Sequence, residues 1–193
     1  PRMASFTELC NDVYTITNRP DLIAETKLAV KQATLKMHQV DYFPKDLFET
    51  GISFSVPAFI QSIDYKTLIP NWRTFKYLRK YPDSMPGDFF ALLSPEETLD
   101  RYAINRDNIC YIAGQQLEIR SNTEDTYMII ACYLHPDVTE PGFSSWIASE
   151  HPYAIVSDAA ASVFKMIGFD EQAAYQKQNV TEQIALLRQN QII

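Results

Sequence analysis

Apolar side chains recur at helical spacing at both ends of the 193-residue chain. The first stripe begins at Ser5, where Ser5 and Glu8 form a capping box in which each side chain bonds the other residue's backbone N–H. We expect this helix to end near Thr17 or Asn18. The segment Asn18-Arg19-Pro20-Asp21 is interpreted as a stop and restart, since proline is favoured in the first turn of a helix. The apolar stripe of the second helix comprises Leu22, Thr26, Ala29, Val30, Ala33 and Met37. The chain therefore opens with two amphipathic helices.

The last third of the chain, residues 144–189, follows the same helical period. Ser144 or Ser145 is expected to cap a short turn ahead of a long helix, whose stripe comprises Ile155, Val156, Ala159, Ala160, Val163, Met166 and Ile167. Gly168 then stands where a left-handed C-cap is expected, because glycine reaches positive φ without a Cβ clash. Asp170 is the predicted N-cap of a second helix. The stripe of that helix comprises Ala173, Val180, Ile184 and Leu187.

Between these hairpins, from Asp46 to about Pro136, the pattern changes to short segments rich in β-branched and aromatic residues. A capping box at Ser94 predicts a short helix through Tyr102, and Ala113-Gly114 predicts a tight turn. The predicted strands are 47–56, 59–65, 73–79, 89–93, 108–112, 116–120 and 127–134.

Two amphipathic hairpins separated by such a module can bury their apolar faces by packing against each other. The predicted fold class is therefore α+β, with a four-helix bundle built from both chain ends and an inserted antiparallel β module. We expect residues 3–42 and 143–193 to form the helical bundle and residues 43–142 to form the β module.

A net charge of −7 argues against a protein that coats nucleic acid through a broad basic face. It is compatible with a passage through which DNA slides without sticking. The longest apolar run, residues 127–134, suits a strand better than a membrane span, so we expect no membrane partner. Cys10, Cys110 and Cys132 form no C-x-x-C pair, and we interpret them as small buried hydrophobic residues in a reducing compartment.

The sequence contains no G-x-S-x-G, P-loop, G-x-G-x-x-G or H-E-x-x-H motif. His38, His135 and His151 lack a His or Cys partner at ligand spacing, so we expect surface or capping residues. Glu96 and Glu97 fit the first turn of a helix, where negative charge complements the dipole. We therefore predict no catalytic site, no metal site and no cofactor. A small hydrolase would need an activated nucleophile, which the sequence does not reveal.

Basic and aromatic residues are interspersed in the segment 71–81. Bases can stack on aromatic side chains while Lys and Arg follow phosphates, so a single-stranded nucleic-acid-binding module is the alternative function. Neither face of this predicted strand is cleanly apolar, which also fits a sheet edge or a subunit contact. The residues assigned to such a contact are Trp72, Arg73, Phe75, Tyr77 and Arg79.

Several segments of the chain resemble the head-to-tail adaptor proteins of short-tailed bacteriophages, which are similar to tail tubular protein A. They are residues 17–36, 44–48 (Pro-Lys-Asp-Leu-Phe), 72–79 (Trp-Arg-Thr-Phe-Lys-Tyr-Leu-Arg), 154–168 and 170–172. The resemblance implies a structural virion protein, assembled in the host cytoplasm, that forms a twelve-fold ring beneath the portal. This ring would join the portal to the tail nozzle and continue the DNA channel.

The resemblance also implies the partners: the portal protein, the tail nozzle protein, further copies of the chain, and double-stranded DNA that passes without specific binding. C-terminal residues in that family insert against the portal. The predicted portal-docking residues are therefore Gln189, Asn190, Gln191, Ile192 and Ile193, and the 72–79 residues named above would contact a neighbouring subunit or the nozzle. Another neck or nozzle protein would share the composition but not the order of the two hairpins.

Overall fold

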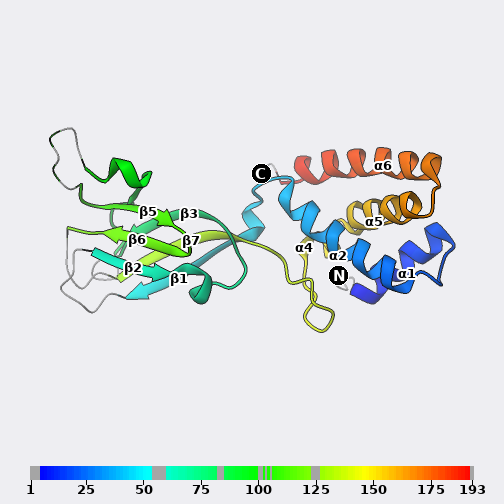
Figure 1. The fold of residues 1–193 in the computed structure, drawn as a ribbon, viewed down its shortest axis with the longest axis horizontal. Coiled ribbons are helices and arrows are strands. Elements are labelled where there is room, and N and C mark those ends of the chain that lie inside the picture. Colours follow the sequence, from blue (N-terminus) through cyan, green and yellow to red (C-terminus); the bar gives the residue numbers. More distant parts are fainter. Residues whose placement is uncertain are drawn as a thin grey trace. The chain divides into compact units, whose positions relative to one another are not determined.

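The computed structural model describes residues 5–53, 60–81, 85–99, 102, 104, 106–122 and 127–191. These residues form six α helices and two β sheets, which confirms a mixed α+β fold (Figure 1). The chain divides into two compact units. The helical unit comprises Pro1–Asp46 and His135–Ile193, and the β unit comprises Leu47–Leu134. The division falls after Asp46 and before His135, whereas the sequence placed it after residue 42 and before residue 143.

Helix α1 (Phe6–Thr17) begins with the predicted capping box. The backbone N–H of Glu8 donates to Ser5 Oγ at 3.2 Å, and that of Ser5 donates to Glu8 Oε2 at 3.3 Å. The helix ends at Asn18, which has a left-handed φ of 53°. Helix α2 (Ile23–Gln39) begins after a turn that contains Pro20. The capping box and the end of the first helix were thus predicted correctly, whereas Pro20 lies in the turn before α2 and not in its first turn.

The C-terminal part of the helical unit contains α4 (Trp146–Glu150), α5 (Pro152–Met166) and α6 (Asp170–Gln189). As predicted, Gly168 ends α5 with a left-handed φ, here 82°. The Gly168 N–H donates to the carbonyl oxygen of Lys165 at 3.3 Å, and the Phe169 N–H donates to that of Phe164 at 2.9 Å, which completes a Schellman motif. Asp170 is the first residue of α6 and not its N-cap, which is Phe169.

Helix α5 is the centre of the helical unit and packs against α1, α2 and α6 (Figure 1). Its inner residues are mainly alanine and valine, whose small side chains allow the neighbouring helices to approach closely. Residues from both ends of the chain meet in one core, since Val13, Ala29 and Val163 are buried together and Ile184 packs against them. Phe43, Ile147 and Leu187 belong to the same core.

The β unit contains two sheets whose side chains share a second core. The first sheet has the order β1 (Leu47–Ser53), β7 (Tyr127–Leu134) and β3 (Trp72–Lys80). The second has the order β2 (Ile60–Asp64), β6 (Gln116–Arg120), β5 (Ile109–Ala113) and β4 (Ala91–Leu92). Residues 54–56 and 59, which complete two predicted strands, lie outside the described residues.

Three details of the β unit differ from the prediction. The module is not wholly antiparallel, because β4 pairs in parallel with β5, with Ala91 opposite Ile109. The predicted strand through Tyr65 ends at Asp64, whose side chain accepts the Thr67 N–H at 3.1 Å and caps the short helix α3 (Tyr65–Leu68). The capping box at Ser94 starts only a 3-10 turn, Pro95–Thr98, since the next residue is extended.

Strand β3 lies at an edge of its sheet, as expected, but its side chains do not follow a regular strand alternation. Its register against β7 shifts between Trp72 and Thr74 and again between Phe75 and Tyr77. Each irregularity adds a residue and reverses the side-chain alternation that follows it. Trp72, Phe75 and Leu78 therefore all pack in or against the core of the β unit. A regular strand alternation over 73–79 would place Phe75 and Leu78 on opposite faces, and the structure does not follow it.

Candidate functional site

The helical unit buries a histidine between a carboxylate and a hydroxyl group. His38 Nδ1 lies 2.9 Å from Asp46 Oδ1, and His38 Nε2 lies 2.7 Å from Ser145 Oγ. Because a carboxylate only accepts hydrogen bonds, we assign the ring proton to Nδ1, which leaves Nε2 to accept the Ser145 hydroxyl. All three side chains are buried. The expectation that His38 is a surface or capping residue was therefore wrong, whereas His151 does cap helices, at the junction of α4 and α5.

Three segments contribute to this Asp46–His38–Ser145 cluster, which we call the polar clamp. His38 lies in the last turn of α2, Asp46 ends the 3-10 turn Pro44–Asp46, and Ser145 is the N-cap of α4. The Trp146 Nε1–H also donates to Asp46 Oδ1 at 2.9 Å, and Ser145 Oγ accepts the Ala148 N–H at 3.2 Å. The clamp thus ties the first hairpin to the start of the last third of the chain. Only the cap at Ser145 had a signal in the sequence.

The clamp has the hydrogen-bond order of a serine hydrolase triad, in which aspartate orients histidine and histidine activates serine. A nucleophile must also reach its substrate, and Ser145 is only 4% exposed. Its oxygen already accepts a backbone N–H as a helix cap. Trp146 covers the cluster together with Phe43, whose ring centroid lies 5.2 Å from that of Trp146. The burial and capping of Ser145 support a structural role for the clamp.

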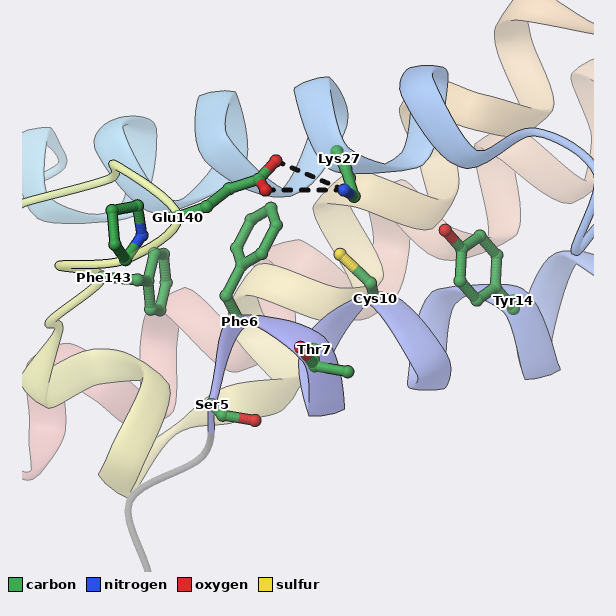
Figure 2. A pocket seen from close by; sticks show the side chains of 9 residues that line it. Ser5, Phe6, Thr7, Cys10, Tyr14, Lys27, Glu140 and Phe143 are labelled. Atoms are coloured by element: carbon green, nitrogen blue, oxygen red, sulfur yellow. Dashed lines mark hydrogen bonds and ion pairs between the residues drawn. The ribbon is translucent and has the colours of Figure 1, made fainter.

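An open groove of about 670 Å³ lies elsewhere on the helical unit (Figure 2). Helices α1 and α2 form its walls, and the loop 140–143 closes one end. The lining residues are Ser5, Phe6, Thr7, Cys10, Tyr14, Lys27, Glu140, Pro141 and Phe143. The phenyl rings of Phe6 and Phe143, with centroids 5.3 Å apart, give the groove an apolar floor near the loop. No local sequence signal marks this groove, because its two walls and its end come from three separate segments.

The charged residues that line the groove are one lysine and one glutamate, Lys27 and Glu140. Glu140 lies 3.4 Å from Lys27 Nζ and 3.7 Å from the Nζ of Lys31, which is not a lining residue. All three side chains are partly exposed, and solvent therefore weakens these ion pairs.

The three cysteines are buried, as predicted. Burial raises the pKa of Cys10 and of Cys132 to about 11 and that of Cys110 to about 12. These thiols therefore stay protonated at neutral pH and are poor nucleophiles. Within the described part of the chain, no group of three His, Cys, Asp or Glu residues is placed to hold a metal ion. No helix in that part is both long and apolar enough to cross a membrane.

The predicted portal-docking residues lie at the end of α6. Gln189 is its last residue, Asn190 is its C-cap, and the Asn190 N–H donates to the carbonyl oxygen of Leu186 at 3.0 Å. Gln191 follows, while Ile192 and Ile193 lie outside the described residues. The described residues of the predicted docking segment, Gln189, Asn190 and Gln191, therefore lie at the C-terminal end of α6.

The predicted contact residues of β3 belong to the β unit and do not form one surface. Trp72 is only 8% exposed and packs on Tyr65, with ring centroids 4.4 Å apart. Arg73 is half-buried. Tyr77 and Arg79 both contact the exposed ring of Phe89. The ring centroids of Tyr77 and Phe89 lie 5.3 Å apart. The guanidinium carbon of Arg79 lies 4.6 Å from the Phe89 ring centroid. Tyr77 and Arg79 are thus the members of the set that border an exposed aromatic side chain.

No protein family model matches the chain, and no curated protein sequence matches it. Its function must therefore be inferred from its fold, from the geometry of the clamp and the groove, and from the sequence resemblance described above. The first two define a helical scaffold with a buried polar clamp and an open groove.

Proposed function

We propose that the chain is a structural virion protein, a head-to-tail adaptor of a short-tailed bacteriophage. Copies of the chain would form a ring, with twelve subunits on family grounds, that joins the portal to the tail nozzle and continues the DNA channel. In this proposal α1, α2, α5 and α6 act as a four-helix bundle built from both chain ends, and the β unit is its insertion. The protein would act in the neck of the virion after assembly in the host cytoplasm.

One observation carries this function: residues of the first and last hairpins share a single core. Val13 and Ala29 come from the first hairpin, Val163 and Ile184 come from the last, and all four belong to one cluster. Interiors of this kind are closely packed and resist deformation. A stiff helical body closed by its own two ends suits a part that holds two larger assemblies in register.

A mechanical role is also supported by the state of the chemically reactive groups. Ser145 is buried and caps a helix, and the three thiols are buried with raised pKa values. The net charge of −7 suits the wall of a DNA channel, because like charge repels phosphate. DNA would then pass through the ring without specific binding.

The geometry of β3 favours this function over the single-strand-binding alternative. Stacking platforms present aromatic faces to solvent. Trp72, the largest aromatic side chain of the segment, is buried in the β unit, and Phe75 packs against the same core. The remaining pair, Tyr77 and Arg79, is better placed to meet a neighbouring subunit or the nozzle. Gln189, Asn190 and Gln191, together with Ile192 and Ile193, would meet the portal.

The test is the state of the purified full chain, measured by native mass spectrometry and electron microscopy. We expect a ring of about twelve subunits, in keeping with closed cyclic symmetry. Fluorescence anisotropy with labelled oligo-dT at low salt should show no binding by the same preparation. A chain that stays monomeric and binds oligo-dT with a steep salt dependence would instead establish the nucleic-acid-binding alternative.

A further inference from the structure

The groove is closed at one end by a loop, residues 137–144, which is held together by its own hydrogen bonds. The Ser144 N–H donates to the Asp137 carbonyl oxygen at 3.0 Å and closes the base of the loop. The hydroxyl and the backbone N–H of Thr139 both donate to Asp137 Oδ1, at 2.6 and 2.9 Å, and these bonds lower the pKa of Asp137. A Cβ on Gly142 would lie only 2.5 Å from Asp137 Oδ2. The loop therefore has a closely packed shape of its own.

The base of the loop is anchored in the helical unit. Ser144 is followed directly by Ser145 of the polar clamp. The Ser145 hydroxyl oxygen lies 2.7 Å from the buried His38 Nε2 and accepts the Ala148 N–H at 3.2 Å. Loss of these contacts would leave buried polar groups without their partners, which is costly. The base is thus a fixed point about which the loop can turn.

The tip of the loop is attached to α1 and α2 by weaker contacts. Glu140 forms ion pairs with Lys27 and Lys31 of α2, and all three side chains are partly exposed. Ion pairs in such positions contribute little and weaken further when salt screens them. An apolar contact joins Phe143 to Phe6 of α1, with ring centroids 5.3 Å apart. The tip is therefore the part of the loop that can leave the helices most easily.

Cys10 lies beside these contacts of the tip. The side chains of Phe6 and Cys10 line the groove, and both point from α1 toward the ion pair of Glu140 with Lys27 (Figure 2). Cys10 is only 4% exposed. Burial is the main cause that raises the pKa of its thiol to about 11, while the nearby lysines, Lys27 and Lys31, lower this pKa and Glu140 raises it. A movement of the loop should therefore change the reactivity of this thiol.

We infer that the loop 137–144 is a salt-sensitive latch on the groove. In the closed state Glu140 holds the tip of the loop on α2. Loss of its ion pairs lets the tip turn away about the base, while the hydrogen bonds within the loop remain. Opening exposes Phe6 and Cys10 and extends the groove toward the loop. The latch is a property of the single chain and does not depend on the proposed ring.

Labelling of Cys10 with N-ethylmaleimide measures opening in the full chain. Mass spectrometry of the labelled peptides separates Cys10 from Cys110 and Cys132, which are fully buried in the β unit. Glu140→Gln removes the ion pairs and should raise the labelling rate about two- to fivefold at low salt. Added salt should bring the rate of the wild type toward that of the variant and leave the variant nearly unchanged.

A second variant separates opening of the latch from a direct effect of charge on the thiol. Lys27→Gln combined with Lys31→Gln removes the same ion pairs as Glu140→Gln. The loss of two positive charges, however, raises the pKa of Cys10 and by itself slows labelling. Labelling that is faster than in the wild type in both variants therefore requires opening.

The matched control is Glu150→Gln. Glu150 pairs with Lys45 elsewhere in the helical unit, and its side chain is 46% exposed, as is that of Glu140. This variant makes the same change of charge and should label Cys10 at the wild-type rate.

Hydrogen exchange distinguishes a turning loop from an unfolded one. In Glu140→Gln the Ser144 N–H should keep its wild-type protection, because its bond to Asp137 lies within the loop. Loss of this protection together with faster labelling would show that the loop unfolds, and the latch would be wrong. Slower labelling in the lysine variant, or equal rates in all variants and at all salt concentrations, would likewise overturn the latch. None of these outcomes bears on the proposed adaptor ring.

Discussion

His38 Nδ1 lies 2.9 Å from Asp46 Oδ1, and the same oxygen accepts the Trp146 Nε1–H at 2.9 Å. One carboxylate oxygen thus joins the end of α2 to the first residue of α4. Asp46 is also the last residue of the helical unit before the chain enters the β unit. These two hydrogen bonds therefore hold α2 and α4 together at Asp46, where the first of the two chain segments of the helical unit ends.

Removal of this acceptor should destabilise the helical unit strongly. Asp46→Ala leaves two donors of the clamp without their partner, and we expect a loss of about 2–4 kcal/mol in the free energy of unfolding. Urea denaturation provides the measurement. The exposed carboxylate of Asp12 is the control, and Asp12→Ala should change stability by no more than about 0.5 kcal/mol. Equal effects of the two substitutions would show that the clamp contributes no net stability.

The hydroxyl of Ser145 should matter for folding and not for chemistry. Ser145→Ala removes an N-cap and the hydrogen bond to His38, which we expect to destabilise the chain by about 1–2 kcal/mol. A fluorophosphonate probe, which marks activated serines, should label neither the wild type nor the variant. Labelling of the wild type that disappears in Ser145→Ala would contradict the structural role and would restore the hydrolase interpretation.

The turn between α5 and α6 should depend on the backbone freedom of Gly168. Its φ is 82°, and a Cβ added there would meet no atom within 4 Å, so any effect of a side chain must come from backbone strain. Gly168→Ala should lower stability by about 1 kcal/mol. Gly168→Asn should have a smaller effect, because asparagine tolerates the left-handed conformation. If thermal or urea unfolding shows that Gly168→Ala and Gly168→Asn lower the stability equally, this explanation is wrong.

Stability should fall as the pH rises above about 9, through the buried thiols. Burial raises the pKa of Cys110 from 9.0 to about 12 in the folded state. Above pH 9 the unfolded thiol therefore loses its proton while the folded thiol keeps it. The unfolded state then binds fewer protons, and the free energy of unfolding decreases by up to about 1.4 kcal/mol per pH unit for each such thiol.

The pH dependence can be isolated with Cys110→Ala. This variant should be less stable than the wild type at pH 8, since it leaves a small cavity. Its urea midpoint should nevertheless decline less steeply between pH 9 and about 11. Parallel slopes for the two proteins would mean that Cys110 titrates alike in the folded and unfolded states.

Local sequence determined the helices and several strands. The capping box at Ser5 and the left-handed Gly168 depend on residues within a few positions of each other, so their geometry is encoded in short segments. The strands Gln116–Arg120 and Tyr127–Leu134 have their predicted bounds, because turn residues and apolar runs delimit them. The three cysteines are buried, as their number and spacing in the sequence predicted.

Only the tertiary structure decided the features that depend on distant partners. The two register shifts in β3 are defined by its pairing with β7. They turn both Trp72 and Phe75 toward the core, whereas a regular alternation would place these two side chains on opposite faces of the sheet. The parallel pairing of β4 likewise depends on the path that returns the chain to β5. Neither feature has a signal within its own segment.

The polar clamp shows the same limit most clearly. Residue types and local caps placed Ser145 at a helix start, but His38 stands 107 positions away and has no partner at ligand spacing in the sequence. The groove is similar, since its lysine comes from α2 and its glutamate from the loop 140–143. The sequence alone determined which elements form, because caps and periodicity act over one or two turns. The tertiary structure decided which side chains meet, because that depends on how the packed core brings distant segments together.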